Sequence, residues 1–140
     1  MTAITIDASA AAAWLLPDEA SPAADTLYAQ AIEGNEVFQA PALWAWESGN
    51  LLRMAVRRGR LSAPQTRRAL HALGRAGVRL EHAPDEPRMA DILALAAAES
   101  LTFYDASYLE QALRTGARLA SKDVALRRSA SARGIVCLEL

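Results

Sequence analysis

Short apolar segments with strand-like character alternate with longer helix-like segments along the whole of this chain. Because parallel strands are joined by long connections that usually contain a helix, this alternation predicts an α/β fold with a central, mostly parallel sheet. The expected strands, about five in number, lie at residues 3–6, 36–40, 78–82, 117–121 and 135–138.

The segments between these strands carry signals that begin and end helices. Ser21 and Pro22 are typical of a helix start, and Gly34 is typical of the position just past a helix end. Ser62 and Gln65 have the spacing of a capping box. About seven helices are expected, at residues 7–16, 21–34, 41–58, 62–77, 87–100, from Thr102 onward and at 124–133.

The chain length sets the number of domains. Its 140 residues, 52% of them hydrophobic, suffice for one domain with a core, so we expect residues 1–140 to form a single domain. The longest apolar runs, 10–16 and 92–98, fall far short of the ~20 residues that cross a bilayer. The N-terminal residues do not have the pattern of a secretory signal. We therefore expect a cytoplasmic protein without a membrane partner.

The charge and the single cysteine restrict the chemistry. A net charge of −1 means that any binding of a polyanion must come from a local patch and not from the overall field. Cys137 alone can form neither an internal disulfide nor a cysteine metal cage, and its apolar surroundings suggest a buried position. His71 and His82 are isolated, so the sequence offers no ligand set for zinc.

Carboxylates recur at the ends of the predicted strands. Asp7 follows the first strand, Asp123 follows the strand at 117–121, and Asp105 falls in the first turn of the helix that begins near Thr102. The carboxyl ends of parallel strands lie at one edge of the sheet, where open α/β sheets place their sites. Glu47 lies within a helix among apolar neighbours, where an unpaired carboxylate is costly to bury.

Each of these acids also has a simpler interpretation. The three aspartates could each cap a helix, and Glu47 could pair with an arginine. If all four converge, however, they repel one another by roughly 3 kcal/mol per pair at ~5 Å and an effective dielectric constant near 20. Such a cluster requires a cation, and oxygen ligands favour Mg²⁺ or Mn²⁺. The chemistry predicted is metal-assisted hydrolysis of a phosphodiester.

Four segments, in this order and at these strand and helix edges, resemble the PIN-domain ribonucleases, and most closely the VapC toxins of bacterial toxin–antitoxin pairs. The resemblance implies a PIN-like three-layer sandwich and an acidic quartet of Asp7, Glu47, Asp105 and Asp123 that holds Mg²⁺ or Mn²⁺. It also implies supporting roles for Ser9, Asn50 and Ser121. The segments are "IDAS" at 6–9, "WESGNLL" at 46–52, "YDASYLEQA" at 104–112 and "ASKDVAL" at 120–126.

The resemblance also implies partners. Members of this family cleave structured RNA such as tRNA or ribosomal RNA, form dimers, and are silenced by a cognate antitoxin. An arginine track that extends from the acidic helix could contact RNA phosphates, although a solvated helix face explains the same residues. The track consists of Arg53, Arg57, Arg58 and Arg60.

The first hypothesis is therefore a metal-dependent endoribonuclease that acts as a toxin. Two alternatives remain open. One is a catalytically silent PIN-like module that only binds RNA or protein. The other is a phosphoacceptor receiver domain, which needs adjacent acids after the first strand, whereas Asp7 stands alone there. A serine hydrolase is excluded because no histidine accompanies Ser9 or Ser121.

Overall fold

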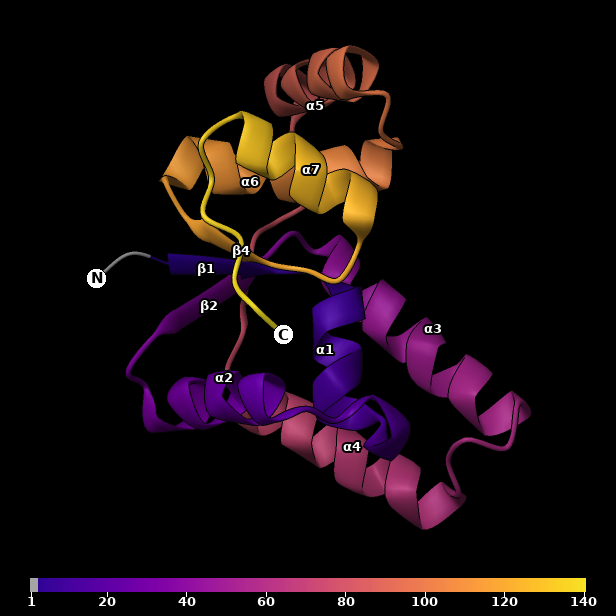
Figure 1. The fold of residues 1–140 in the computed structure, drawn as a ribbon. Helices are drawn as coiled ribbons and strands as arrows, with labels where there is room; N and C mark the ends of the chain where they lie inside the picture. The colour runs from indigo at the N-terminus through magenta and orange to yellow at the C-terminus, as the bar shows by residue number, and fades with distance from the viewer. Residues whose placement is uncertain (1–2) are drawn as a thin grey trace.

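A four-stranded parallel sheet forms the centre of the molecule (Figure 1). The structure, a computed structural model, describes residues 3–140. The strand order is β3-β2-β1-β4, and every pair of neighbours is parallel. The strands are β1 (Ala3–Ile6), β2 (Val37–Ala40), β3 (Arg79–Leu80) and β4 (Arg118–Ala120). The α/β class predicted from the alternating pattern is thus confirmed.

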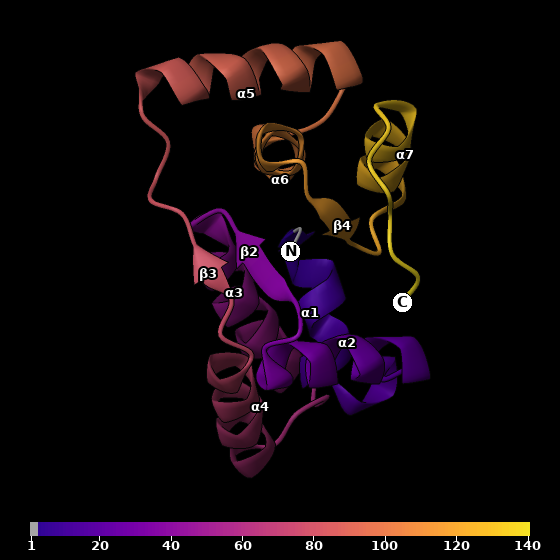
Figure 2. The ribbon, with the colours of Figure 1, turned by 90° about the vertical axis from the view of Figure 1, so that its left-hand side faces the viewer.

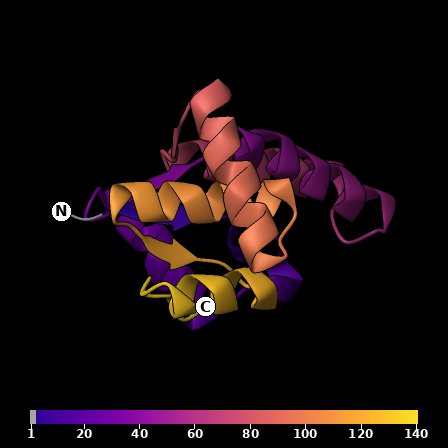
Figure 3. The same ribbon diagram turned by 90° about the horizontal axis from the view of Figure 1, so that it is seen from above.

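Seven α-helices cover the two faces of this sheet. Helices α5, α6 and α7 lie on one face and α1 to α4 on the other (Figures 1 and 2), which makes the three-layer arrangement that was expected. Seen from above, α5 crosses over α6 (Figure 3). The helices are α1 (Ala8–Leu15), α2 (Pro22–Glu33), α3 (Leu43–Arg57), α4 (Ala63–Arg75), α5 (Glu86–Glu99), α6 (Phe103–Thr115) and α7 (Val124–Ala132), with a short 3₁₀ turn at Pro17–Glu19.

The local helix signals act as predicted. Ser21 caps α2, and Gly34 ends it in the left-handed conformation, with φ of 74°. Ser62 and Gln65 form both hydrogen bonds of the capping box at the start of α4. These signals involve residues at most three positions apart, so they do not depend on the rest of the fold.

The predicted fifth strand at residues 135–138 is wrong. Only one isolated bridge forms there, between Leu119 and Cys137. The Ile135 amide donates to the Ala130 carbonyl at the end of α7, and the Leu138 carbonyl accepts from the Arg127 guanidinium. The Val136 carbonyl and the Leu138 amide pair with Leu119 of β4, but the Leu138 carbonyl, which a longer ladder would use, accepts from Arg127, so the pairing ends after one bridge. Cys137 is only partly buried.

Two hydrophobic clusters fix the elements around the sheet edge. The larger one packs Ile4, Phe38 and Leu119 from three strands against helices that include Leu109 of α6. The smaller one joins α1, α3 and α4, with Leu52 of α3 among its members. The start of α1 and the middle of α3 are therefore held in place by packing. Within residues 3–140, no helix is both long enough and apolar enough to span a membrane.

Candidate active site

Asp7 occupies the junction between β1 and α1 and is almost fully buried, with 6% of its surface exposed. Its Oδ1 accepts hydrogen bonds from the Ala10 amide (3.0 Å) and from the Ser9 hydroxyl (2.7 Å). Its Oδ2 accepts from the Ser121 hydroxyl (2.5 Å). Asp7 is thus the expected helix cap, but two serine hydroxyls that a cap does not require also fix its orientation.

Asp123 lies beside Asp7 at the same sheet edge, because β4 pairs with β1 and Ile6 is in register with Ala120. Its Oδ1 caps α7 by accepting from the Leu126 amide at 2.8 Å. The Asp123 amide donates to the Ser121 hydroxyl at 3.0 Å. The Ser121 hydroxyl therefore bridges the two strand ends, since the same group donates to Asp7.

Glu47 reaches this edge from α3 and is half-buried. Its Oε1 accepts a hydrogen bond from the Tyr108 hydroxyl at 2.6 Å. Burial raises the pKa of Glu47, the hydrogen bond from Tyr108 acts in the opposite direction, and the charges of Asp7 and Asp105 raise the pKa further. Burial and the neighbouring negative charges thus disfavour the ionised form of Glu47, and a bound cation would favour it.

Tyr108 is a residue that the sequence analysis missed. It is 1% exposed and comes from α6, three residues after Asp105, so both side chains lie on one face of that helix. This spacing was readable in the sequence, but the distant partner on α3 was not.

Asp105 lies in the first turn of α6, where its amide donates to the Thr102 hydroxyl at 3.1 Å. Burial raises the pKa of Asp105, and the negative charges of Asp123 and Asp7 add to this shift. Burial is also the main cause of the raised pKa of Asp7, which the Ser121 and Ser9 hydroxyls partly offset and Asp123 increases. Asp7 and Asp105 are thus within electrostatic reach of Asp123, and Glu47 is within electrostatic reach of Asp7 and Asp105.

The chemistry of this donor set fits a hard divalent cation. None of the four acids takes part in an ion pair with any basic side chain of residues 3–140. Across the same part of the chain, no group of three or more acidic, histidine or cysteine side chains is arranged so that it could hold a metal ion together. Mg²⁺ does not require such a group, because it keeps several waters and binds through one or two carboxylates.

The remaining predicted residues occupy varied places. Asn50, Arg53 and Arg57 are exposed on α3, and Arg58 is exposed just past the end of that helix. Arg60, the last member of the arginine track, is bound to acidic side chains of the protein itself. Its Nε and Nη2 donate to Asp18 (2.9 Å), and Nη2 also donates to Glu19 (2.8 Å), so two of its three nitrogens are engaged by carboxylates.

Replacing Tyr108 by Phe tests whether its hydroxyl orients Glu47. We expect Mg²⁺ affinity to fall by roughly tenfold, the lower end of the effect of removing a group that orients a metal ligand. Calorimetric titration of the metal into the protein measures this directly. Tyr28→Phe is a matched control, since it removes a hydroxyl bonded to the Ala72 carbonyl (2.8 Å) and to none of the four acids. Equal Mg²⁺ affinity in Tyr108→Phe and the wild type would disprove the orienting role.

The parallel three-layer fold, with acids at the carboxyl ends of its strands, defines the class, and the chain belongs to the PIN domain family, whose sequence profile matches residues 4–131. A similar solved structure is the crystal structure of PAE2754 from Pyrobaculum aerophilum. It superposes with a TM-score of 0.74 at 26% sequence identity, over 97% of this chain and 83% of that one. A comparison with curated proteins gives no match. PIN domains are typically nucleases that use divalent metals, and the family suggests RNA as the bound partner.

Proposed function

We propose that this protein is an Mg²⁺- or Mn²⁺-dependent endoribonuclease. The observation that carries the proposal is a group of neighbouring acids from different helices that have no basic partner among the described residues; the pKa values of Asp7, Glu47 and Asp105 are raised by burial and by the charges of nearby acids, Asp123 included. A helix cap alone has no need of such neighbours. A divalent cation gives one reason for all four acids to be together.

Asp7, Glu47, Asp105 and Asp123 would hold the ion or ions. When bound, a divalent cation supplies positive charge to the phosphate and lowers the pKa of a coordinated water. Ser9 and Ser121 keep the Asp7 carboxylate in one orientation, and Tyr108 does the same for Glu47.

The hydrolysis itself needs a proton acceptor and a positioned backbone. Water adds to phosphorus as the bond to the leaving ribose oxygen breaks. An acid of the quartet with a raised pKa accepts the proton of that water, and the same proton is then passed to the leaving ribose oxygen, which departs as a hydroxyl. Arg53, Arg57 and Arg58, which are exposed, would contact the neighbouring phosphates of the RNA. We assign Arg60 no such role, because two carboxylates already bind its guanidinium.

We further propose that the protein is a VapC-type toxin. Its RNA substrate would then be a tRNA or a ribosomal RNA, a cognate antitoxin would silence it, and it would act in the cytoplasm as a homodimer. These assignments rest on the four sequence segments that resemble the toxins. Arrest of growth on expression, relieved by co-expression of an antitoxin, would support the toxin role. Normal growth at high expression would refute that role without refuting the nuclease.

Cleavage assays with purified protein test the nuclease. Structured RNA should be cut in the presence of Mg²⁺ or Mn²⁺, and EDTA should stop the reaction because the acids alone repel the phosphate. Asp105→Asn should cut much more slowly in the same buffers. A silent module would bind RNA without cutting it, and a receiver domain would instead accept a phosphoryl group from acetyl phosphate. Either of these results would overturn the proposed activity.

A further inference from the structure

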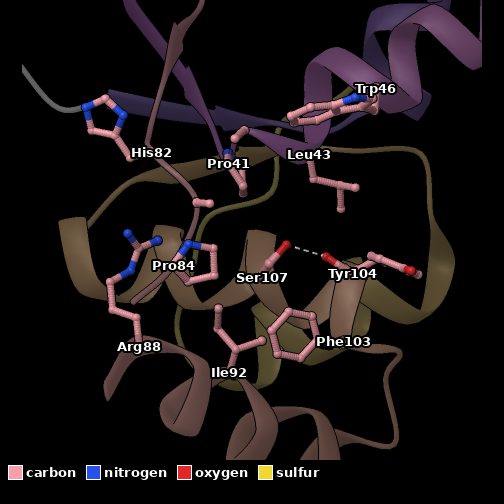
Figure 4. Close-up of a pocket in the computed structure, with 12 residues that line it drawn as sticks. Pro41, Leu43, Trp46, His82, Pro84, Arg88, Ile92, Phe103, Tyr104 and Ser107 are labelled. Atoms are coloured by element: carbon pink, nitrogen blue, oxygen red, sulfur yellow. Dashed lines mark hydrogen bonds between the residues drawn. The ribbon is translucent and has the colours of Figure 1, made fainter. Parts of the chain in front are cut away.

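A pocket of about 200 Å³ is lined by residues that include chain neighbours of two of the acids (Figure 4). Its walls come from the start of α3, the segment between β3 and α5, helix α5 and the start of α6. Two of its residues, Trp46 and Tyr104, immediately precede Glu47 and Asp105 in the chain. Since consecutive Cα atoms are about 3.8 Å apart, the pocket and the acids share the same turns of the two helices. A ligand bound at the acids can therefore extend into the pocket.

Aromatic side chains dominate one part of this pocket. Trp46 is 73% exposed and Tyr104 is 60% exposed, although such large apolar groups usually lie inside a protein. Figure 4 shows the Trp46 ring at the upper side of the pocket, with Phe103 and Ile92 below it. The only aromatic pairs within residues 3–140 are those of Trp14 with Tyr28 and with Phe38. The faces of Trp46 and Tyr104 are thus free to stack on a ligand.

Polar groups lie at the opposite side. His82 and Arg88 are on the side away from Trp46 (Figure 4). The Arg88 guanidinium is 3.7 Å from Glu81 and 3.8 Å from Glu110, beyond hydrogen-bond distance, so these carboxylates do not saturate its donors. The Ser107 hydroxyl donates to the Tyr104 carbonyl at 2.6 Å and keeps its lone pairs as acceptors.

We propose that this pocket binds one unstacked base of the RNA, from the nucleotide next to the bond that is cut; the inference rests on the proposed RNA cleavage. The pocket is smaller than the roughly 300–1,000 Å³ of sites for drug-sized ligands, so it suits a single ring system. Aromatic faces stack on any base, and donors and acceptors at the far side can read the edge of the base.

This assignment restricts the RNA substrate. Bases within a duplex are stacked and paired, so they cannot enter a pocket of this kind without leaving the helix. Proteins generally read RNA sequence in loops, bulges and single strands for this reason. We therefore assign the cleavage site to a loop or another unpaired segment, with the aromatic pocket selecting the base beside it.

Kinetics of Trp46 variants provide the first test. Trp46→Ala should raise the KM for a short single-stranded RNA by about tenfold, the size of one lost base–aromatic stack, with a smaller effect on kcat. Because most of the side chain is exposed, no core cavity results. Trp46→Phe should retain most of the affinity. Val136→Ala, which truncates a 61% exposed apolar residue outside the pocket, should leave KM unchanged.

Fluorescence of Trp46 provides a direct binding measurement. In the Asp7→Asn protein, which we expect to bind RNA without cutting it, base stacking should quench this emission, and Trp46→Phe should remove most of the change. RNA strands that lack one base at a chosen position identify the base that enters. We expect one abasic position, next to the cleavage site, to weaken binding by about tenfold.

The outcomes separate the two proposals. If the wild-type protein cuts no RNA, the proposed function fails. If it cuts RNA, but Trp46→Ala leaves KM within twofold of the wild type and no abasic position weakens binding, the base pocket is refuted and the nuclease stands. A third outcome, in which Trp46→Ala separates a dimer into monomers while KM is unchanged, would refute the base pocket and show that it is an interface between two copies of the chain.

Discussion

Asp7→Asn should reduce RNA cleavage by about 10²- to 10³-fold, on the scale of losing one preorganised electrostatic group from an active site. The asparagine oxygen can still accept from the Ala10 amide, so the cap on α1 is kept. Its amide nitrogen can donate to the Ser121 hydroxyl, which would reverse the bond seen with Asp7. What disappears is the negative charge that would hold a cation. The rate of RNA cleavage in Mg²⁺ measures the loss.

The stability of the same variant separates a metal role from a capping role. Burial raises the pKa of Asp7 in the folded state, so the contribution of this group to stability is greatest below its unfolded pKa and is lost as pH rises through the folded pKa. At neutral pH without divalent ions, Asp7→Asn should therefore melt at or above the wild-type temperature. Mg²⁺ should then raise the melting temperature of the wild type and not that of the variant.

A matched control is available at the start of α5. Asp85 also caps a helix, accepting from the Arg88 amide at 3.1 Å, but it is exposed and is not one of the four acids. Asp85→Asn should therefore leave both the cleavage rate and the Mg²⁺ stabilisation unchanged. If Asp7→Asn cleaved RNA as fast as the wild type, the metal role of Asp7 would be wrong. If the variant unfolded at neutral pH, the main role of Asp7 would be in the fold and not in metal binding.

Features of the fold that depend on residues close together in the chain could be predicted from the sequence, whereas features that depend on distant residues could not. The caps at Ser21 and Ser62 depend on residues within one helical turn, and they are confirmed. The segment at 135–138 was misjudged because its apolar character says nothing about the groups that compete for its backbone, such as the Arg127 guanidinium. Strand pairing is a long-range property, and composition alone does not determine it.

The same limit applies to the candidate site. In a parallel sheet the carboxyl ends of the strands lie at one edge. The sequence therefore predicted that Asp7 and Asp123, which follow β1 and β4, lie near each other. The Tyr108 contact to Glu47 joins residues 61 positions apart, and the ion pair of Arg60 with Asp18 joins residues 42 positions apart. Neither contact leaves a local signature, so the sequence analysis did not name Tyr108 and placed Arg60 in the arginine track.

A polar network holds α6, the helix that carries both Asp105 and Tyr108. The Arg114 guanidinium donates to Glu110 (2.7 Å) and to Glu81 (2.8 Å), which directly follows β3. Gln111 also donates to Glu81 (2.6 Å) and accepts from the Thr5 hydroxyl of β1 at 3.0 Å. Because Glu110 is only 7% exposed, removing Arg114 deprives a nearly buried carboxylate of its hydrogen-bond donor and leaves it only the Arg88 guanidinium, 3.8 Å away.

Arg114→Ala should lower the free energy of unfolding by about 2 kcal/mol, less than the ~3–5 kcal/mol for breaking a fully buried ion pair, because the Arg114 side chain is 38% exposed. Urea unfolding at neutral pH measures this. Arg133→Ala is the matched control, since that side chain is 39% exposed and has a single acidic partner, Glu99. The control should lose no more than about 1 kcal/mol, as exposed pairs do.

The pH dependence of this difference distinguishes charge from packing. Burial acts to raise the pKa of Glu81, but hydrogen bonds from Arg114 and Gln111 outweigh it and hold the pKa below its ordinary value. A lowered folded pKa gives stability that is present above the unfolded pKa and is lost as pH falls through the folded one. The gap between wild type and Arg114→Ala should therefore narrow below about pH 4.5, near the unfolded pKa of a glutamate. A gap that stayed constant down to strongly acidic pH would mean that Arg114 supports α6 through the packing of its aliphatic stem and not through its charge.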